Sequence, residues 1–405
     1  MRRSMTSWMN AAPFAPTGRV KAYGDLPDRV SILNRESAKL AGHLNHETAQ
    51  TIRRHMAVIN SYYSNLIEGN QTLPHQIREA QRGNYDSDPT ARDHQLESVA
   101  HIKVQDWIRS ASRDLDEVLS PEFIRSIHRH FYADLPERLK VVKDEDGNEQ
   151  RVVGGEFRTS TVSIGRHIPP DHQYVKTLVD QFCSEYKSQR YVGEMRITAL
   201  MAAHHRLLWI HPFLDGNGRV VRLWTDAALQ AAGVEGIGVW CLSRGLARSS
   251  SNYKAKLAHA DYPLQGTADG RGPLSETGLT DFTRFMVDTA IDQVDYVGSL
   301  LDLKGMQQRI ENYVNARRDG RIVACPDPLK PEASLILFQA FIQGSVERAH
   351  ALRLAGGRDG KDRTARRALH QLKADGLLSE RNNRSPLKWE IPEHAEPFYF
   401  PNLSS

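Results

Sequence analysis

Residues 211–222 combine a histidine, an aspartate, two glycines and two arginines in one short segment, HPFLDGNGRVVR. A histidine such as His211 titrates near neutral pH and can remove a proton from a hydroxyl group. Asp215 offers hard carboxylate oxygens of the kind that Mg²⁺ prefers. Arg219 and Arg222 lie three residues apart, so in a helix they share a face from which two guanidinium groups can bind one phosphate chain. The segment therefore predicts a site for a nucleoside triphosphate.

Two predicted helices position this segment. Apolar residues recur at helical spacing over 195–209, which predicts a buried amphipathic helix, and Pro212 ends it. From Asn217 the helical pattern resumes, so the glycine-containing loop leads into a second helix, whose first N–H groups attract anions. The alternative is an ordinary loop with solvated arginines. We disfavour it because a single segment supplies a base, a metal ligand, an anion-binding turn and two cations.

These residues make the chain resemble the Fic family, whose similar members transfer AMP from ATP to a protein hydroxyl. The resemblance implies that His211 is the general base for attack on the α-phosphate, that Asp215 binds Mg²⁺ and that pyrophosphate leaves. It also implies that the nucleotide is bound by Gly216, Asn217, Gly218, Arg219, Val220, Val221 and Arg222. Relatives with lysine in place of Gly218 transfer phosphate instead, so this glycine favours AMP transfer.

A second segment, Ser64 to Gly69, ends a helical pattern that begins at about residue 47. Taken alone, it is an ordinary helix end with Gly69 as a C-cap and Glu68 as a solvated side chain. The pattern Ser-x-x-x-Glu-Gly resembles the inhibitory helix of many Fic proteins, in which the glutamate pairs with the second motif arginine, here Arg222. Glu68 would then compete with the ATP γ-phosphate and misplace the α-phosphate, which slows attack. In some relatives this glutamate also serves removal of AMP, so a reverse activity at Glu68 is a further expectation.

Residues 154–165, GGEFRTSTVSIG, resemble the flap that holds the target segment in this family by strand pairing. β-Branched residues favour a strand here, and residues 149–153 are the predicted partner strand of a small hairpin. The resemblance assigns contact with the protein target to Thr161, Val162, Ser163 and Ile164. An ordinary surface hairpin is the alternative.

A further predicted helix opens near residue 251 and carries the expected contacts to the nucleotide base. Relatives usually have an asparagine and paired tyrosines there, which correspond to Asn252 and Tyr253, whereas Lys254 departs from the pattern. Asn252 is expected to hydrogen-bond to the adenine and Tyr253 to pack against it. A capping asparagine before a core tyrosine explains the same residues equally well.

Length and composition indicate an ordinary globular chain of two or three domains. The 405 residues carry a net charge of +4, which does not by itself mark a nucleic-acid binder. The three cysteines show no pairing or metal-binding spacing, which favours a reduced, cytoplasmic location. The sequence predicts neither a secretion signal nor a transmembrane helix. We predict an N-terminal arm at 1–28, a helical region at 29–110 with the inhibitory helix at about 47–69, a catalytic core at 120–315 and a linker at 318–331.

The C-terminal residues 332–395 differ in character from the predicted core. Three predicted helices, at 335–341, 346–354 and 362–374, precede a short hairpin that ends with a strand at 387–391, which is the order of a winged helix-turn-helix. Residues 346–390 contain eleven Lys and Arg against six Asp and Glu. Arg363, Arg366 and Arg367 lie on the third helix and predict contacts with DNA. Dimerisation or docking of a target is the alternative use of this module.

The predicted fold is mainly α: a Fic-type helical bundle with a small β-hairpin flap and a C-terminal winged helix-turn-helix. The predicted function is an autoinhibited adenylyltransferase that uses ATP and Mg²⁺ to modify a Ser, Thr or Tyr hydroxyl of a protein. The alternative is a DNA-binding regulator or toxin–antitoxin component whose core senses ATP. The presence of both His211 and Arg222 favours the enzyme. Relatives often form homodimers, so a homodimer is also expected.

Overall fold

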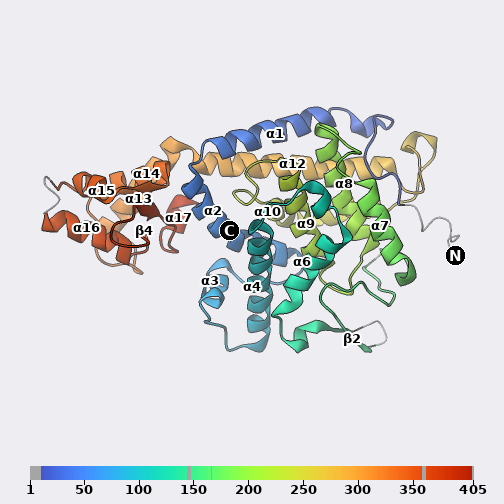
Figure 1. Ribbon diagram of the computed structural model, residues 1–405, viewed down its shortest axis with the longest axis horizontal. Coiled ribbons are helices and arrows are strands. Elements are labelled where there is room, and N and C mark those ends of the chain that lie inside the picture. The colour runs from blue at the N-terminus through green and yellow to red at the C-terminus, as the bar shows by residue number, and fades with distance from the viewer. Residues whose placement is uncertain (1–10, 144–146, 166, 358–361, 404–405) are drawn as a thin grey trace. The chain divides into compact units, whose positions relative to one another are not determined.

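The computed structural model describes residues 11–143, 147–165, 167–357 and 362–403. As predicted, it is mainly helical, and its sheets are small. The chain divides into two compact units (Figure 1). The first contains residues 1–37, 60–237 and 241–293, and the second contains residues 38–59, 238–240 and 294–405.

The described helices follow one another with only short strands between them. In chain order the helices, with η marking 3₁₀ turns, are η2 (Lys21–Tyr23), α1 (Leu26–Gly42), α2 (His46–Ile67), α3 (Pro74–Gln81), α4 (Pro89–Arg109), α5 (Leu115–Val118), α6 (Pro121–Ala133), η3 (Glu137–Lys140), η4 (His172–Tyr174), α7 (Val175–Glu185), α8 (Glu194–Ile210), α9 (Asn217–Ala231), α10 (Leu242–Arg248), α11 (Ser250–Ala260), η5 (Thr267–Asp269), α12 (Glu276–Leu301), α13 (Leu303–Arg318), α14 (Ala333–Gln343), α15 (Arg348–Leu354), α16 (Arg363–Ala374) and α17 (Glu396–Tyr399). The strands are β1 (Val141–Lys143), β2 (Glu149–Arg151), β3 (Ser345–Val346), β4 (Leu378–Ser379) and β5 (Leu387–Trp389).

Helix α8 forms the centre of the first unit, where it packs against α7 and α9 (Figure 1). Its existence and bounds agree with the sequence prediction, but its amphipathic character does not. From Ile197 to Ile210 every residue except Leu208 is buried. The polar side chains on this helix are buried because other segments satisfy them. His205 Nε2, for example, contacts Asp261 Oδ1 at 2.9 Å.

Helices α4 and α6 cover the motif helix α9 and begin with the same local signal. Asp88 and Ser120 each accept a hydrogen bond from an N–H in the first turn, and a proline follows each of them. An oxygen-bearing N-cap followed by proline suits a helix start, because the cap satisfies an exposed donor and proline has none. The two helices pack against each other and against α9. They therefore bring side chains from residues 89–133 to the motif.

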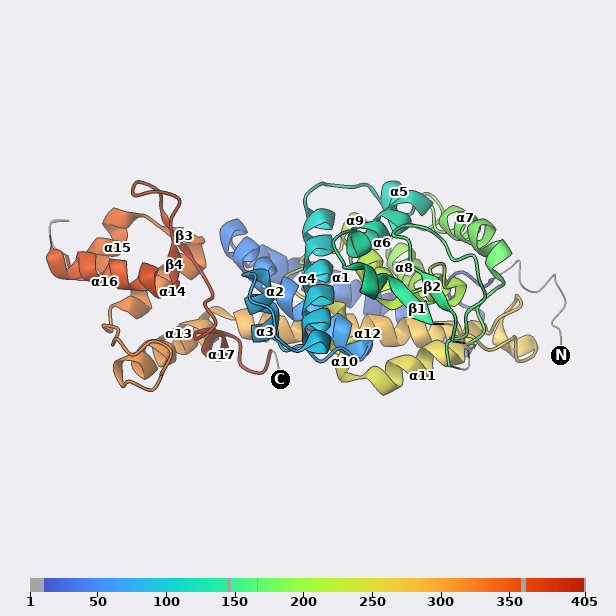
Figure 2. The same cartoon turned by 90° about the horizontal axis from the view of Figure 1, so that it is seen from below.

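The predicted flap hairpin has a different partner from the one expected. Strand β2 pairs antiparallel with β1, with Val142 opposite Gln150, and Figure 2 shows the two strands together. Residues 159–164 form no strand, and among the described residues only an isolated bridge joins Ile164 to His167. The prediction of a strand there was wrong, because a side chain takes the place of a strand ladder. The guanidinium of Arg158 donates to the carbonyls of Ser160 and Pro170.

The second unit contains the C-terminal helices and a three-stranded antiparallel sheet of order β3-β5-β4. Helices α14, α15 and α16 precede the antiparallel pair of β4 and β5, as predicted, and the assignment as a winged helix-turn-helix stays a prediction. The sequence did not indicate β3, which has only two residues. Trp389 is fully buried and packs edge-on against Phe341. Across both units, none of the described helices is long and apolar enough to span a membrane.

Candidate active site

The motif begins at a strained turn that the flap segment holds in place. His211 directly follows α8 and adopts a left-handed backbone conformation with φ of 50°. For a residue with a side chain this costs on the order of 1–3 kcal/mol, so the surroundings must enforce it. Arg158 Nε donates to the carbonyl of His211 at 2.8 Å, and the Arg158 N–H donates to the carbonyl of Pro212 at 2.9 Å. A single buried arginine therefore ties the flap segment to the turn that carries His211.

The imidazole of His211 has the protonation state that a general base needs. Burial, together with the charges of His167 and Arg158, lowers the pKa of His211 to about 4. The ring is therefore neutral at pH 7. Because a neutral imidazole carries a single N–H, the other nitrogen has the lone pair that can take a proton.

The loop between α8 and α9 is fixed by its own side chains. Asn217 Nδ2 donates to the carbonyl of Phe213 at 2.8 Å, and Asn217 Oδ1 accepts from the Phe213 N–H at 2.9 Å. Gly216 has φ of +77°, a conformation that side chains rarely adopt. Helix α9 then begins at Asn217, as predicted. Its first N–H groups have no carbonyl one turn earlier to bind, which suits an anion.

Each of the two terminal nitrogens of Arg219 contacts an acid. Its Nη1 contacts Glu97 on α4 at 2.7 Å, and its Nη2 contacts Asp215 at 3.2 Å. The guanidinium carbon also lies 4.6 Å from the centre of the Phe131 ring. Burial opposes ionisation of Asp215, but Arg219 and a hydrogen bond from the Tyr132 hydroxyl outweigh it, so the pKa of Asp215 falls below its usual value. The expected metal ligand is therefore ionised.

Arg222 contacts the end of α2 rather than the acids that hold Arg219. Its Nε donates to Ser64 Oγ at 2.9 Å, and its Nη2 donates to Glu68 Oε1 at 2.6 Å and to the Ser64 carbonyl at 2.9 Å. The pairing of Glu68 with Arg222 that the resemblance implies is thus present. Helix α2 ends at Ile67, and Glu68 lies in the turn before Gly69.

The two partners of this ion pair differ in exposure. The side chain of Arg222 is 3% exposed, whereas that of Glu68 is 38% exposed. Burial would raise the pKa of Glu68, but the charges of Arg222 and Arg219 and the hydrogen bond from Arg222 outweigh it and lower that pKa. Glu68 is thus an ionised side chain that reaches a buried cation from an accessible position.

Gly218 provides the space that Glu68 occupies. A Cβ atom at residue 218 would lie 2.2 Å from Glu68 Oε1 and 3.0 Å from Arg222 Nη1. Any side chain at residue 218 would therefore push the carboxylate away from its present position. Val220 and Val221, in the same segment, are buried in the core, so their contacts with a nucleotide would come from the main chain.

The residues expected to bind the base and the target lie in two other places. Asn252 is exposed on α11, whereas Tyr253 is 2% exposed and packs among Phe282 and Phe285. This placement agrees with the core-tyrosine alternative, and the contact with adenine stays a prediction. In the flap segment Thr161, Ser163 and Ile164 are exposed and Val162 is half-buried. The main chain of Ile164 pairs with His167, and the contact of these residues with a target stays a prediction.

The sequence did not point to several residues that complete the site. Glu97 and Tyr132 contact Arg219 and Asp215 from other helices, and no local spacing connects them to the motif. Arg158 belongs to the quoted flap segment. Its charge within a run of β-branched residues was the available signal for a buried contact.

The acidic side chains near the motif fit a metal ion that is bound partly by substrate phosphates, rather than one bound by protein ligands alone. Among the described residues, no group of three or more His, Cys, Asp or Glu side chains is placed to hold a metal ion. Asp215 supplies one ionised carboxylate beside the arginine-lined loop. Mg²⁺ is commonly bound in this way, by one or two carboxylates plus substrate phosphates.

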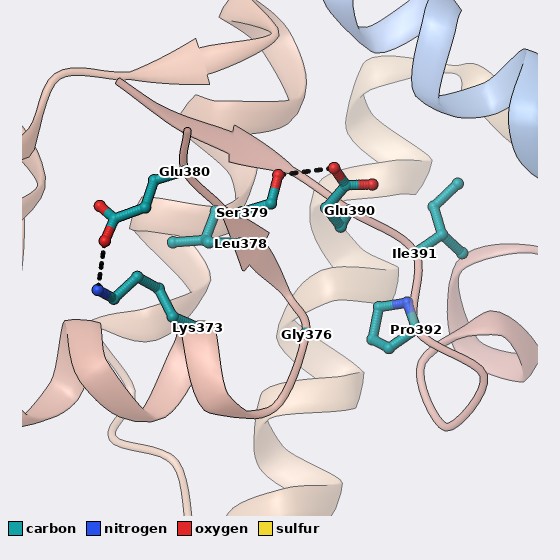
Figure 3. A pocket seen from close by; sticks show the side chains of 8 residues that line it. All are labelled: Lys373, Gly376, Leu378, Ser379, Glu380, Glu390, Ile391 and Pro392. Carbon is teal, nitrogen blue, oxygen red and sulfur yellow. Dashed lines mark hydrogen bonds and ion pairs between the residues drawn. The ribbon is translucent and has the colours of Figure 1, made fainter. Parts of the chain in front are cut away.

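A separate cavity of about 550 Å³ lies within the second unit and contains none of the predicted site residues. Figure 3 shows Lys373 paired with Glu380 and Ser379 paired with Glu390 along its wall. These polar groups satisfy one another, so the cavity has no obvious ligand chemistry.

Comparison with known proteins connects the first unit to a family. Residues 118–229 match the model of the Fic/DOC family. The protein named Protein adenylyltransferase Fic of Drosophila mojavensis is 28% identical over 200 residues, which is 49% of this chain and 35% of that protein. The protein of the same name from Aedes aegypti is 33% identical over 107 residues, which is 26% of this chain and 21% of that protein. The chain thus spans about a third or less of these relatives.

Solved structures show a similar fold. A Fic family protein from Desulfovibrio desulfuricans G20 has a TM-score of 0.52 at 16% identity, over 90% of this chain and 96% of that chain. Fic-1 from C. elegans (residues 134–508) has a TM-score of 0.50 at 18% identity, over 68% of this chain and 71% of that chain. At such identities the likeness concerns the fold.

Proposed function

This chain carries a Fic/DOC family domain at residues 118–229, and from that premise we propose that it transfers AMP from ATP to a hydroxyl of a protein and that Glu68 restrains the transfer. The observation that carries the proposal is the position of Arg222. Its guanidinium belongs to the arginine-lined motif, yet it is bound by a carboxylate from the end of α2. A substrate phosphate and Glu68 would need the same donor.

The chemistry uses groups that are already in the required state. The hydroxyl oxygen of the target attacks the α-phosphorus of ATP, and His211 accepts the hydroxyl proton on its unprotonated ring nitrogen. The bond from the α-phosphorus to the bridging oxygen breaks, and pyrophosphate leaves with the bonding electrons. A neutral His211 at pH 7 supports this role.

The other motif residues bind and orient the nucleotide. The first N–H groups of α9 and the guanidinium groups of Arg219 and Arg222 would bind the phosphate chain. Asp215 would hold Mg²⁺, which neutralises phosphate charge when it is bound. Because Asp215 contacts Arg219 and Tyr132 here, nucleotide binding would rearrange these contacts.

Glu68 would act by competition. Its carboxylate occupies the Arg222 donor that the γ-phosphate needs, so ATP would bind with its α-phosphate misplaced. A displacement of about an ångström can lower the rate about a hundredfold. The exposed position of Glu68 supports its displacement in an active state. A carboxylate beside the phosphates also supports the reverse reaction, in which Glu68 would orient water to remove AMP.

The test measures transfer of radiolabelled AMP from Mg²⁺·ATP to the chain itself and to proteins of a cell lysate. We expect little label with the wild-type chain, about a hundredfold more with Glu68→Gly, and none with Glu68→Gly/His211→Ala. A matched control is Glu79→Gly, which removes a glutamate of similar side-chain exposure (41%) that pairs with Arg82 on α3. Absence of label with Glu68→Gly under conditions where ATP binds would contradict AMP transfer. Equal label with and without Glu68 would contradict autoinhibition alone.

A second candidate function is DNA binding by residues 346–390. It is supported by the exposure of Arg363, Arg366 and Arg367 on α16. Phosphate contacts would make the affinity fall steeply with salt. We expect Arg363→Ala/Arg367→Ala to weaken binding of a fluorescent DNA duplex, and Lys176→Ala/Arg190→Ala, which removes exposed cations from the first unit, to leave it unchanged. Salt-independent or undetectable binding by the wild-type chain would rule this candidate out.

A further inference from the structure

His128, on α6, is a fully buried histidine that has no part in the proposed chemistry. Its ring stacks on that of Phe213, with the ring centres 4.0 Å apart and an angle of 9° between the planes. The ring of Tyr132, one helical turn later on α6, lies 4.6 Å away. Because Phe213 belongs to the loop between α8 and α9, the stacking orients the His128 ring relative to the motif.

The two ring nitrogens of His128 bond to two separate parts of the candidate site. The N–H of Gly155, in the flap segment at residues 154–165, donates to His128 Nδ1 at 2.8 Å. His128 Nε2 lies 3.2 Å from the main-chain carbonyl oxygen of Asp215, the expected Mg²⁺ ligand. A main-chain N–H can only donate and a carbonyl can only accept, so Nδ1 offers its lone pair and Nε2 carries the proton. Burial lowers the pKa of His128 to about 4, in agreement with this neutral ring.

Helix α6 holds the beginning of the flap segment by both polar groups of one residue. The N–H of Gly155 is bound by His128, and its carbonyl accepts from Arg125 Nε at 2.7 Å. A Cβ atom at Gly155, where φ is +85°, would lie only 3.1 Å from the main-chain oxygen of Arg125. The glycine therefore allows the flap main chain to approach α6 closely enough for these bonds.

The bond from His128 to Asp215 leaves the Asp215 carboxylate available. That carboxylate accepts from the Tyr132 hydroxyl and contacts Arg219, and these contacts would rearrange when Mg²⁺ binds. His128 contacts the carbonyl oxygen of Asp215 instead, so its bond can persist while the carboxylate changes partners.

We infer that His128 is a positioning residue that holds the flap segment and the Asp215 main chain in a fixed relation to each other. Its Nδ1 sets where the flap presents the target, and its Nε2 sets where the Asp215 carboxylate meets Mg²⁺ on the phosphates. One buried ring thus aligns the target hydroxyl with the α-phosphate. The inference rests on the proposed function, because it assumes that the flap holds the target and that Asp215 binds Mg²⁺.

Two substitutions of His128 separate its two bonds. In His128→Asn the amide oxygen can take the position of Nδ1 and accept from Gly155, whereas the donor to Asp215 is lost. In His128→Gln the amide nitrogen can take the position of Nε2 and donate to Asp215, whereas the acceptor for Gly155 is lost. A third variant, His128→Phe, keeps a ring against Phe213 and loses both bonds.

The test measures nucleotide binding and flap hydrogen exchange in the Glu68→Gly/His211→Ala background, in which nothing is consumed. By calorimetry, His128→Asn should raise the Kd for Mg²⁺·ATP about fivefold and leave the Kd for ATP without Mg²⁺ unchanged, because the freed Asp215 must be ordered again. By mass spectrometry, His128→Gln should speed amide exchange in a peptide that covers Gly155 about fivefold and leave the Kd for Mg²⁺·ATP unchanged. His128→Phe should show both effects.

His101→Asn and His101→Gln are the matched controls. His101, on α4, is 1% exposed, and its Nδ1 lies 3.1 Å from Gln105 Nε2, outside the motif and the flap segment. We expect these variants to lower the melting temperature about as much as the His128 variants do, while leaving both Kd values and the flap exchange unchanged.

Two results would overturn the inference. If His128→Asn and His128→Gln had equal effects in both measurements, the ring would act only through packing. If His128→Phe matched its parent in both measurements, neither bond would matter, and this comparison holds even where an amide variant does not fold. If Glu68→Gly binds Mg²⁺·ATP but transfers no AMP, the proposed function fails while the binding and exchange measurements still decide this inference. Absence of Mg²⁺·ATP binding would overturn both.

Discussion

Two arginines of helix α9, three residues apart, are held in different ways. Arg219 is 7% exposed and contacts Glu97, itself 21% exposed, and Asp215. Arg222 is 3% exposed, but its acid partner Glu68 is 38% exposed and lies beyond the end of a helix. The distances alone do not distinguish the Glu97–Arg219 pair from the Glu68–Arg222 pair. We propose that the more buried Glu97–Arg219 contact persists when Arg219 binds phosphate, and that the Glu68–Arg222 contact is the one exchanged for a phosphate.

The largest expected effect is on stability, on the Arg219 side. Glu97→Gln should lower the free energy of unfolding by about 3 kcal/mol, because removing one partner leaves a buried charge poorly compensated. Glu68→Gln should lower it by less, because the Glu68 side chain is 38% exposed and because Arg222, although buried, keeps its hydrogen bonds to Ser64. Urea unfolding at neutral pH measures both. Equal losses for the two variants would break the distinction between a structural and an exchangeable pair.

On the Arg222 side the expected effect is on activity. Glu68→Gln should raise AMP transfer by up to about a hundredfold, because the neutral amide competes poorly with a phosphate for the guanidinium. In an assay of labelled AMP incorporation, Glu97→Gln should give no comparable gain at a temperature where both variants are folded. A gain from Glu97→Gln would mean that Arg219, too, is restrained by its acid.

The residues around these two arginines also show how much of the site can be predicted from the sequence. His211, Asp215 and the two arginines were predicted because their spacing within one segment is itself the signal, whereas Glu68 was predicted only because Ser-x-x-x-Glu-Gly resembles the inhibitory helix of Fic proteins. Glu97 and Tyr132 reach the motif through the packing of α4 and α6 against α9, and such contacts leave no spacing in the sequence. The central helix α8 was predicted as amphipathic because its apolar residues recur at helical spacing, but its histidines and Arg206 are buried as well. Hydrogen bonds from distant segments allow them to be buried.

The flap segment shows that strand pairing, like contacts between helices, is hard to predict from the sequence. Thr159 to Ile164 have the residue types of a strand, and β2 was correctly placed within 149–153. The predicted pairing partner was wrong, because β2 pairs with β1, and the Arg158 guanidinium binds the Ser160 carbonyl of the later segment. Residue types predict the preference for extended structure, whereas the partner depends on tertiary contacts.

A substitution of Arg158 tests the role of His211 separately from the roles of Arg219 and Arg222. Arg158→Lys cannot bond the carbonyl of His211 and the flap carbonyls together, because an ammonium lacks the guanidinium fork. In the Glu68→Gly background, we expect kcat to fall about tenfold through misplacement of His211, with the KM for ATP unchanged. Arg125→Lys is the control, since Arg125 bonds only the Gly155 carbonyl of the flap. A rise in the KM for ATP with unchanged kcat would place Arg158 with the phosphate-binding groups instead.

The smallest expected effect is that of pH, and it tests the exchangeable pair directly. The lowered pKa of Glu68 means that its ion pair is fully formed above the ordinary glutamate pKa and is lost only as the pH falls through the lower folded value. His211, with its pKa lowered to about 4, stays an unprotonated base over the same range. Between about pH 5.5 and 8, the kcat of Glu68→Gly and its ratio to the wild-type rate should therefore change by less than about twofold, whereas a histidine of ordinary pKa would lose about tenfold. Acidification should thus leave the restraint intact, because only a ligand that binds Arg222 more strongly than Glu68 does can displace an acid that remains ionised. A wild-type rate that rises towards the Glu68→Gly rate as the pH falls to about 5.5 would show that protonation alone releases Arg222.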